Sequence, residues 1–318
     1  MAIDLFAFYN GLTEQERGYS YFQRYGHLLD EIAFFQVPIQ SNGELDGRPS
    51  RKLINEAHRK GVKAYITITN LTSAGQFSTS LMTQLVRNPV FASRVLQNIR
   101  NLLSTYRLDG VNFDLEKAAA QDRNLYSQLI YNWTVQLRQD NYRVTLDAPA
   151  KTADDPTDVW KGAFDYRVLG QIVDEIVLMT YEEHWPGSPP GSVASLPWVN
   201  QVLDYALANI PAQKIIMGVP LYGYDWVQGN GAKVISYRRA TELARRMGAP
   251  LQWDAQQHST FFRYTSEGKQ HTVYFEDVRS LKEKLDLAIR RGIKGVALWE
   301  MNLSYPELWT TLQTYKQG

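Results

Sequence analysis

Cysteine is absent from this sequence of 318 residues. Its absence excludes disulfide bonds, thiolate metal sites and a cysteine nucleophile. An excess of one charge sign is also missing, because 34 Lys and Arg residues face 33 Asp and Glu residues and leave a net charge of +1. Proteins that bind nucleic acids or anionic membranes usually carry a basic excess or a basic run, so the charge balance supports neither partner.

Long hydrophobic runs are missing as well. No apolar run approaches the ~18 residues of a membrane-spanning helix. The chain opens with MAIDLFAFYN, which has no basic segment ahead of a long apolar run. We therefore expect no membrane span and no signal peptide in this chain. Because an export signal can be removed from a protein, this expectation leaves the location open.

Aromatic residues are the one abundant class. The chain has 19 Tyr, 12 Phe and 8 Trp residues, which make up 12% of it, in a composition that is 44% hydrophobic and 21% charged. This composition is typical of a globular protein with a sizeable core, where most of the aromatic rings are expected. A surplus of flat rings also suits a carbohydrate groove, because a pyranose ring presents an apolar C–H face to an aromatic surface.

Short apolar runs alternate with segments of helical period. The segment 89–107 is one of these, and we place its residues Val90, Val95, Ile99, Leu102 and Leu103 on one helical face. The apolar runs, which we predict to be strands, cover residues 3–9, 31–38, 63–70, 108–116, 142–149, 174–182, 214–223 and 294–302. Eight strands in alternation with helices predict an α/β fold, a parallel (β/α)8 TIM barrel.

The connection after the seventh predicted strand is too long for a single helix. It contains a helical segment, RRATELARRMG, and two strand-like runs, FFRYT and HTVYFE, which flank the hairpin loop SEGKQ. We therefore predict a small α+β insertion subdomain at residues 227–276, within a barrel formed by residues 1–226 and 277–318.

The segment LDGVNFDLE, residues 108–116, alternates in an unusual way. In a strand Asn112, Asp114 and Glu116 share one face, and the apolar residues between them share the other. A solvated strand end would show the same pattern, but acids inside a packed barrel are costly unless paired or functional. Barrel active sites lie at the carboxyl ends of the strands. The polar and aromatic residues that we place there are Gln36, Asn70, Asn112, Asp114, Glu116, Asp147, Tyr181, Glu182, Tyr222, Tyr224 and Trp299.

The segment DGVNFDLE resembles the strand-4 signature of glycoside hydrolase family 18, the chitinases and their relatives, whose pattern is Asp-x-x-Asp-x-Asp-x-Glu. Asp109, Asp114 and Glu116 match this pattern, and Asn112 stands where the family usually has Asp. LMTYE, GVPLYGYDW and GVALWEMN are similar to the family's segments at strands 6, 7 and 8. Together with YEEHWPGSPPG, the segments are closer still to a branch in endospore formers that acts on cortex peptidoglycan.

The resemblance implies a retaining glycosidase that cleaves next to N-acetylglucosamine in a β-1,4-linked polymer. Glu116 would be the general acid and later the base, while the substrate's own acetamido oxygen acts as nucleophile. Asp114 would orient the acetamido group, Tyr181 would donate a hydrogen bond to it, and Trp299 would form the floor beneath the sugar. Asn112 removes the repulsion between two adjacent aspartates, so we expect Asp114 to ionise more readily than in a two-Asp site.

Further residues complete the expected site. Asp109 is expected to have a structural role in the motif. We expect no cofactor and no metal, since His184 beside two Glu residues lacks the spacing of a metal motif. Contacts with the sugar are expected from Asn112, Asp147, Glu182, Tyr222, Tyr224 and Gln36.

The expected partner is a polysaccharide, with spore-cortex peptidoglycan or its fragments ahead of chitin oligosaccharides. The resemblance also implies a spore-associated or cell-wall-facing location, and cell-wall-binding repeats elsewhere in a longer protein. Two alternatives stay open. One is a non-catalytic chitinase-like sugar-binding protein, although such proteins usually lose the Glu at the position of Glu116. The other is a divalent-metal site at the strand-4 acids, which no His partner supports.

Overall fold

The computed structural model describes residues 3–317. In it, eight parallel strands close into a barrel in the order β1-β13-β7-β6-β5-β4-β3-β2, which confirms the predicted fold class. The barrel strands are β1 (Asp4–Asn10), β2 (Glu31–Pro38), β3 (Lys63–Thr69), β4 (Gly110–Asp114), β5 (Arg143–Pro149), β6 (Glu175–Met179), β7 (Ile215–Pro220) and β13 (Gly295–Trp299).

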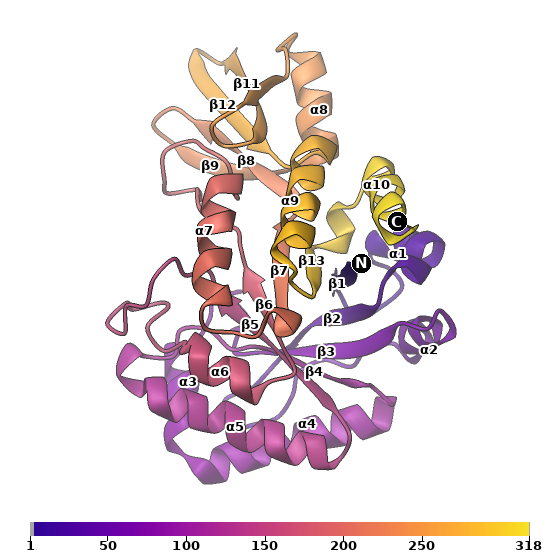
Figure 1. Ribbon diagram of the computed structural model, residues 1–318, viewed down its shortest axis with the longest axis vertical. Helices are drawn as coiled ribbons and strands as arrows, with labels where there is room; N and C mark the ends of the chain where they lie inside the picture. Colours follow the sequence, from indigo (N-terminus) through magenta and orange to yellow (C-terminus); the bar gives the residue numbers. More distant parts are fainter. Residues whose placement is uncertain (1–2, 318) are drawn as a thin grey trace.

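Helices cover the outside of the barrel (Figure 1). In the helix that spans 89–106, Val95 and Ile99 are buried, but Val90 is 71% exposed, so its predicted place on the apolar face is wrong. Val90 and Val95 are five residues apart, which places them on different sides of a helix with 3.6 residues per turn. The helices are α1 (Gly18–Tyr25), α2 (Arg51–Arg59), α3 (Thr79–Arg87), α4 (Pro89–Tyr106), α5 (Arg123–Gln139), α6 (Tyr166–Ile172), α7 (Leu196–Leu207), α9 (Val278–Arg291) and α10 (Pro306–Gln317).

The alternation in β4 separates two environments. Val111, Phe113 and Leu115 are fully buried in the large core cluster, which the helices share with the outer faces of the strands. Asn112 and Asp114 have the opposite parity and face the barrel interior. Regular pairing of β4 ends at Asp114, earlier than predicted, so Glu116 lies beyond the last ladder residue, at the mouth of the barrel.

The opposite end of the barrel is closed by ion pairs. Lys294 pairs with Glu31 and Glu175, and Arg143 pairs with Glu175 as well. Both carboxylates are almost fully buried, and each retains one oxygen without a hydrogen-bond partner among the described residues. Buried charges of this kind need close partners. This network therefore leaves the carboxyl ends of the strands as the accessible end of the barrel.

An antiparallel sheet follows β7 and stands at one end of the molecule (Figure 1). The predicted seventh strand, 214–223, is too long, because β7 ends at Pro220 and the insertion's sheet begins at Tyr222. The division of the chain into domains stays a prediction. The sheet has the order β10-β11-β12-β8-β9, with strands and one helix at β8 (Tyr222–Val227), β9 (Gly231–Ser236), α8 (Tyr237–Arg246), β10 (Gln252–Asp254), β11 (Ser259–Ser266) and β12 (Lys269–Phe275).

The hairpin of the insertion is tighter than predicted. Ser266 pairs with Lys269, so most of the segment SEGKQ belongs to the strands and only Glu267 and Gly268 form the turn. Both turn residues have positive φ, as a two-residue turn of type I′ requires. After β12 the chain returns to the barrel through α9, whose start is fixed by a capping box between Asp277 and Ser280.

Candidate active site

Glu116 and Asp114 lie at the accessible end of β4. Both side chains are buried, with exposed fractions of 6% and 5%. Asn70, the residue after β3, holds the main chain at Glu116: its Nδ2 donates to the Glu116 carbonyl at 2.8 Å, and its Oδ1 accepts from the Glu116 N–H at 2.9 Å. The acid is thus attached to the end of a neighbouring strand by two buried hydrogen bonds.

Asn112 connects the β4 acids to β5. Its Nδ2 donates to Asp147 Oδ1 at 2.9 Å and to Thr145 Oγ1 at 3.0 Å. Asn112 is fully buried, and its own Oδ1 and Asp114 Oδ1 have no hydrogen-bond partner among the described residues. Buried polar atoms are rarely left unpaired, so the unpaired Asp114 oxygen is available to a polar group of a ligand that enters the mouth of the barrel.

Burial controls protonation in this group of acids. Desolvation raises the pKa of the Glu116 carboxyl, and the nearby Asp114 and Asp147 carboxylates raise it further. Desolvation also raises the pKa of Asp114 and of Asp147, while the hydrogen bond from Asn112 acts against this at Asp147. Glu116 therefore keeps its proton at neutral pH, which is the state that a general acid requires.

Tyr181 and Trp299 face the same space from other strands. Tyr181 follows β6, and burial raises the pKa of its phenol well above the ordinary value, so the hydroxyl keeps its proton and can donate it in a hydrogen bond. Trp299 ends β13 and is partly exposed; Phe8 and Phe35 pack edge-on against it, with centroid distances of 5.3 and 4.9 Å. These contacts fix the orientation of the indole ring at the barrel mouth.

A cavity of about 670 Å³ opens beside Glu116. Its volume is within the usual range for small-molecule sites. Two of its tryptophans, Trp160 and Trp185, are 39% and 53% exposed, which is unusual for so large an apolar side chain. The cavity is lined by Glu116, Pro149, Ala150, Trp160, Lys161, Met179, Tyr181, Glu182, Trp185 and Trp198.

Glu182 joins the barrel to the insertion. The hydroxyls of Tyr222 and Tyr224, both on β8, donate to its carboxylate, the second at 2.8 and 3.0 Å to the two oxygens. Both tyrosines are buried, and burial followed by the Glu182 charge raises their pKa values. The three residues predicted to contact sugar thus form one hydrogen-bonded group, of which Glu182 lines the cavity.

Gln36 and Asp109 lie at opposite ends of the barrel. Gln36 is near the end of β2, half-buried, and its Oε1 has no partner among the described residues. Asp109 precedes β4, where its Oδ2 accepts from the Ala64 N–H at 2.7 Å and lies 2.9 Å from His58 Nε2. This position, remote from Glu116 along the strand, fits the structural role that we expect for Asp109.

Residues 7–303 match the glycosyl hydrolases family 18. The chain belongs to this family. It is therefore a glycosidase. Within residues 3–317 no group of three or more His, Asp or Glu side chains is placed to hold a metal ion. Over the same residues no helix is long and apolar enough to cross a membrane.

Similar proteins include cortex-lytic enzymes and chitinases. The chain is 34% identical over 292 residues to the cortical fragment-lytic enzyme of Bacillus cereus, a match that covers 90% of this chain and 67% of that protein. The crystal structure of the B. cereus spore cortex-lytic enzyme SleL has a TM-score of 0.91 and 30% identity, over 99% of this chain and 74% of that one. A chitinase from Chromobacterium violaceum has a TM-score of 0.91 and 28% identity, over 99% of both chains.

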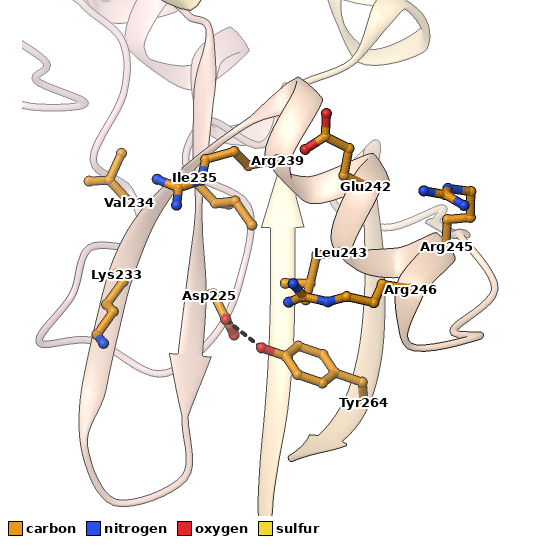
Figure 2. Close-up of a pocket in the computed structure, with 10 residues that line it drawn as sticks. All are labelled: Asp225, Lys233, Val234, Ile235, Arg239, Glu242, Leu243, Arg245, Arg246 and Tyr264. Atoms are coloured by element: carbon orange, nitrogen blue, oxygen red, sulfur yellow. Dashed lines mark hydrogen bonds between the residues drawn. The ribbon is translucent and has the colours of Figure 1, made fainter. Parts of the chain in front are cut away.

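A second cavity lies in the insertion. Its volume is about 620 Å³, and none of the predicted site residues lines it. Figure 2 shows the Tyr264 hydroxyl directed at Asp225, to which it donates at 2.7 Å, with Arg246 reaching toward the same pair from α8. His271 Nδ1 also contacts Asp225, at 2.9 Å. The Asp225 carboxylate is thus already partnered, unlike the Asp114 oxygen in the barrel.

Sequence reasoning missed several residues of the site. Trp160 and Lys161 belong to the loop after β5, and Trp198 lies on α7, where the sequence shows no chemical motif. Trp185 follows β6 in the Pro/Gly-rich segment WPGSPPGS. Its position after a predicted strand could have indicated Trp185, but the exposure of its side chain could not be predicted from the sequence.

Proposed function

We propose that the chain is a retaining β-N-acetylglucosaminidase that cleaves a β-1,4-linked polymer beside N-acetylglucosamine by substrate-assisted catalysis. One observation carries the proposal: a buried Glu116 carboxyl that retains its proton faces a cavity next to Asp114. A single proton-transferring carboxyl is sufficient where the substrate supplies the nucleophile, and family 18 is a recognised exception to the two-carboxylate scheme.

In the first step Glu116 gives its proton to the glycosidic oxygen, and the bond from that oxygen to the anomeric carbon breaks. The acetamido carbonyl oxygen of the same sugar attacks the anomeric carbon and forms a cyclic oxazolinium ion. Asp114, with its unpaired Oδ1, accepts a hydrogen bond from the acetamido N–H and aligns the carbonyl. The Tyr181 hydroxyl, which keeps its proton, donates to the acetamido group.

In the second step the Glu116 carboxylate removes a proton from a water molecule. The resulting hydroxide attacks the anomeric carbon, opens the oxazolinium ring and restores the acetamido group. Two displacements at one carbon retain its configuration. Trp299 lies beneath the sugar and supports its apolar face during both steps.

The remaining predicted residues act around this centre. Asp147, Glu182, Tyr222, Tyr224 and Gln36 would contact the sugar or its neighbours at the rim. Asn112 has no exposed surface, so we propose that it acts through its hydrogen bond to Asp147. No cofactor has a part in this scheme.

The proposed substrate is spore-cortex peptidoglycan or its fragments. Relatives that match most of the chain are named for lysis of the cortex or of cortical fragments. We propose a spore-associated or cell-wall-facing location on the same basis, and a longer protein that also carries cell-wall-binding repeats.

Chitin oligosaccharides are the second candidate, favoured by the likeness to the C. violaceum chitinase over 99% of both chains. A non-catalytic sugar-binding role is less consistent with the site, because Glu116 is both present and protonated.

The test is digestion of intact cortex, fragmented cortex and chitotetraose, followed by borohydride reduction and mass analysis of the reducing ends. The proposal predicts N-acetylglucosamine at the new reducing ends of the cortex products, and product formation about 10³-fold slower with the Glu116→Gln variant. Muramic acid at those ends, or full activity of the variant, would contradict it.

A further inference from the structure

We propose that Lys117 and Lys161 form a carboxylate-binding subsite for the leaving sugar, one that recognises the acidic substituent of a muramic acid residue. The inference rests on the proposed function and specifies its substrate: the unit that departs carries a negative charge close to the sugar ring. Neither lysine belongs to the site predicted from the sequence.

The position of the cavity identifies the side of the bond that it serves. Glu116 and Tyr181 line the cavity where it meets the sugar under attack, whereas Trp299 and Asp114, which we propose lie beneath and beside that sugar, do not line it. A general acid must face the oxygen of the leaving group. The cavity that extends from Glu116 toward Trp160 and Trp185 is therefore the space into which the leaving sugar projects.

Lys117 stands next to the acid in a conformation that few side chains adopt. Its φ is +57°, in the left-handed region, which costs a non-glycine residue of order 1 kcal/mol and persists only where surrounding contacts enforce it. Its Nζ lies 4.9 Å from the centre of the Trp160 ring. This cation–π contact limits the freedom of the ammonium group and holds it beside Trp160, which is part of the cavity wall.

Lys161 adds a second cation on the same wall. It lines the cavity, and its main-chain N–H donates to Asp158 Oδ1 at 2.8 Å, which fixes the loop beneath it. Within residues 3–317 neither Lys117 nor Lys161 lies within 4 Å of a carboxylate, in contrast to Lys151, which pairs with Asp154. The unpaired cations remain available to a ligand.

Among residues 3–317, the acids that line this cavity form no ion pair with these cations. Glu116 holds its proton, and the Glu182 carboxylate is occupied by the hydroxyls of Tyr222 and Tyr224. Trp160, Trp185 and Trp198 give the cavity apolar walls, and apolar surroundings strengthen an ion pair because they lower the local dielectric. The cavity thus combines apolar walls with an unpaired positive charge.

Among β-1,4-linked amino-sugar polymers, this positive charge would distinguish an acidic leaving sugar from a neutral one. A leaving N-acetylglucosamine of chitin is neutral. A leaving muramic acid carries a lactyl ether whose carboxyl group is either free and charged or joined to a peptide with carboxylates of its own. Muramic lactam, in which that carboxyl is closed onto the ring amine, is neutral. The subsite would therefore favour muramic acid over both neutral sugars.

The experiment compares kcat/KM on tetrasaccharides of equal length: chitotetraose, a glycan with free lactyl carboxylates, a glycan with stem peptides and a muramic-lactam glycan. The Lys117→Gln/Lys161→Gln variant is compared with the wild type and with Lys282→Gln, which removes an exposed lysine on α9. We expect the ratio of kcat/KM on acidic to neutral substrate to fall about tenfold or more in the double variant only. Lys117 also lowers the pKa of Glu116, but this effect is common to all substrates and cancels in the ratio.

If the kcat/KM ratio of the double variant falls for the free lactyl glycan, the carboxylate that the lysines bind is the lactyl carboxylate. If the ratio falls only for the peptide-bearing glycan, that carboxylate belongs to the peptide. An unchanged ratio for both overturns the proposal. Should the wild type hydrolyse none of the glycans, the proposed function has failed, and calorimetric binding to the Glu116→Gln protein tests the subsite separately. In that measurement the subsite proposal would be overturned if acidic and neutral glycans bind with equal affinity, both to the Glu116→Gln protein and to the same protein with Lys117→Gln and Lys161→Gln added.

Discussion

Asn70 engages both main-chain polar groups of Glu116, donating to its carbonyl and accepting from its N–H. The contact joins the ends of two neighbouring strands, β3 and β4, at the point where regular pairing has stopped. A side-chain amide thus continues the ladder by one further pair of hydrogen bonds. The consequence is a fixed position for the acid beside the cavity.

The Asn70→Ala variant tests this arrangement. It leaves two buried main-chain groups of Glu116 unpaired, each at a cost of about 1–3 kcal/mol. We expect the free energy of unfolding to fall by about 2 kcal/mol or more, and kcat to fall at least about tenfold with a smaller change in KM. Denaturant unfolding and steady-state kinetics measure both. Asn132→Ala, on the exposed face of α5, is the control, and a wild-type kcat for Asn70→Ala would show that the contact does not position the acid.

Glu116→Gln removes the proposed proton donor while it keeps the size of the side chain. Loss of a general acid lowers rates by about 10²–10⁴-fold, so we expect kcat to fall by about 10³-fold on a substrate with a poor leaving group. Affinity for a tetrasaccharide, measured by calorimetry, should be retained. A residual kcat above about a tenth of wild type would contradict the assigned role.

The same variant makes a prediction about stability. Because the folded-state pKa of Glu116 is raised above its unfolded value, the unfolded chain releases its proton first, and wild-type stability falls as pH rises above about 4.3. Glutamine does not ionise. Glu116→Gln should therefore be more stable than wild type at pH 7–8 by about 1 kcal/mol or more, the free energy of one pKa unit. The difference should vanish near pH 3, where the glutamate is protonated in both states, and thermal unfolding at the two pH values checks it.

Asn112→Asp introduces another acid beside Asp114 and Asp147. Like charges in a buried group raise one another's pKa values, so Asp114 should ionise at higher pH than in the wild type. We expect the acidic limb of the pH–rate profile to move upward, with substantial activity preserved because Glu116 is untouched. An unshifted profile would mean that Asn112 does not influence the ionisation of the site.

Glu182→Ala tests the link between barrel and insertion. The substitution leaves the Tyr222 and Tyr224 hydroxyls without their acceptor in a buried position. The expected loss of stability is about 1–3 kcal/mol, measured by thermal unfolding. Tyr222→Phe, which removes one donor and leaves Glu182 with the other, should lose less. Glu267→Ala, in the hairpin turn, serves as the surface control. If Glu182→Ala and Tyr222→Phe are as stable as this control, the contact between barrel and insertion does not contribute to stability.

Local periodicity in the sequence predicted much of the fold. The alternation in 108–116 assigned Asn112 and Asp114 to the interior and the apolar residues to the helical layer, as the structure confirms. The number of strand-like runs predicted the closed barrel.

Other features depended on residues that are distant in the sequence. The predicted strand 214–223 spans a sharp change of direction. Only the pairing of Tyr222 with Ser236 shows that Tyr222 belongs to the sheet of the insertion. No pattern in the sequence links Asn70 to Glu116, or Lys117 to Trp160.

The sequence by itself determined which side chains face the hollow of the barrel and which chemistry they carry, because side-chain direction in a strand follows from its two-residue repeat. The tertiary structure alone decided which of these groups meet, how deeply they are buried and hence where the proton resides. Desolvation and charge coupling depend on the distances between strand ends and loops, and closure of the barrel sets those distances.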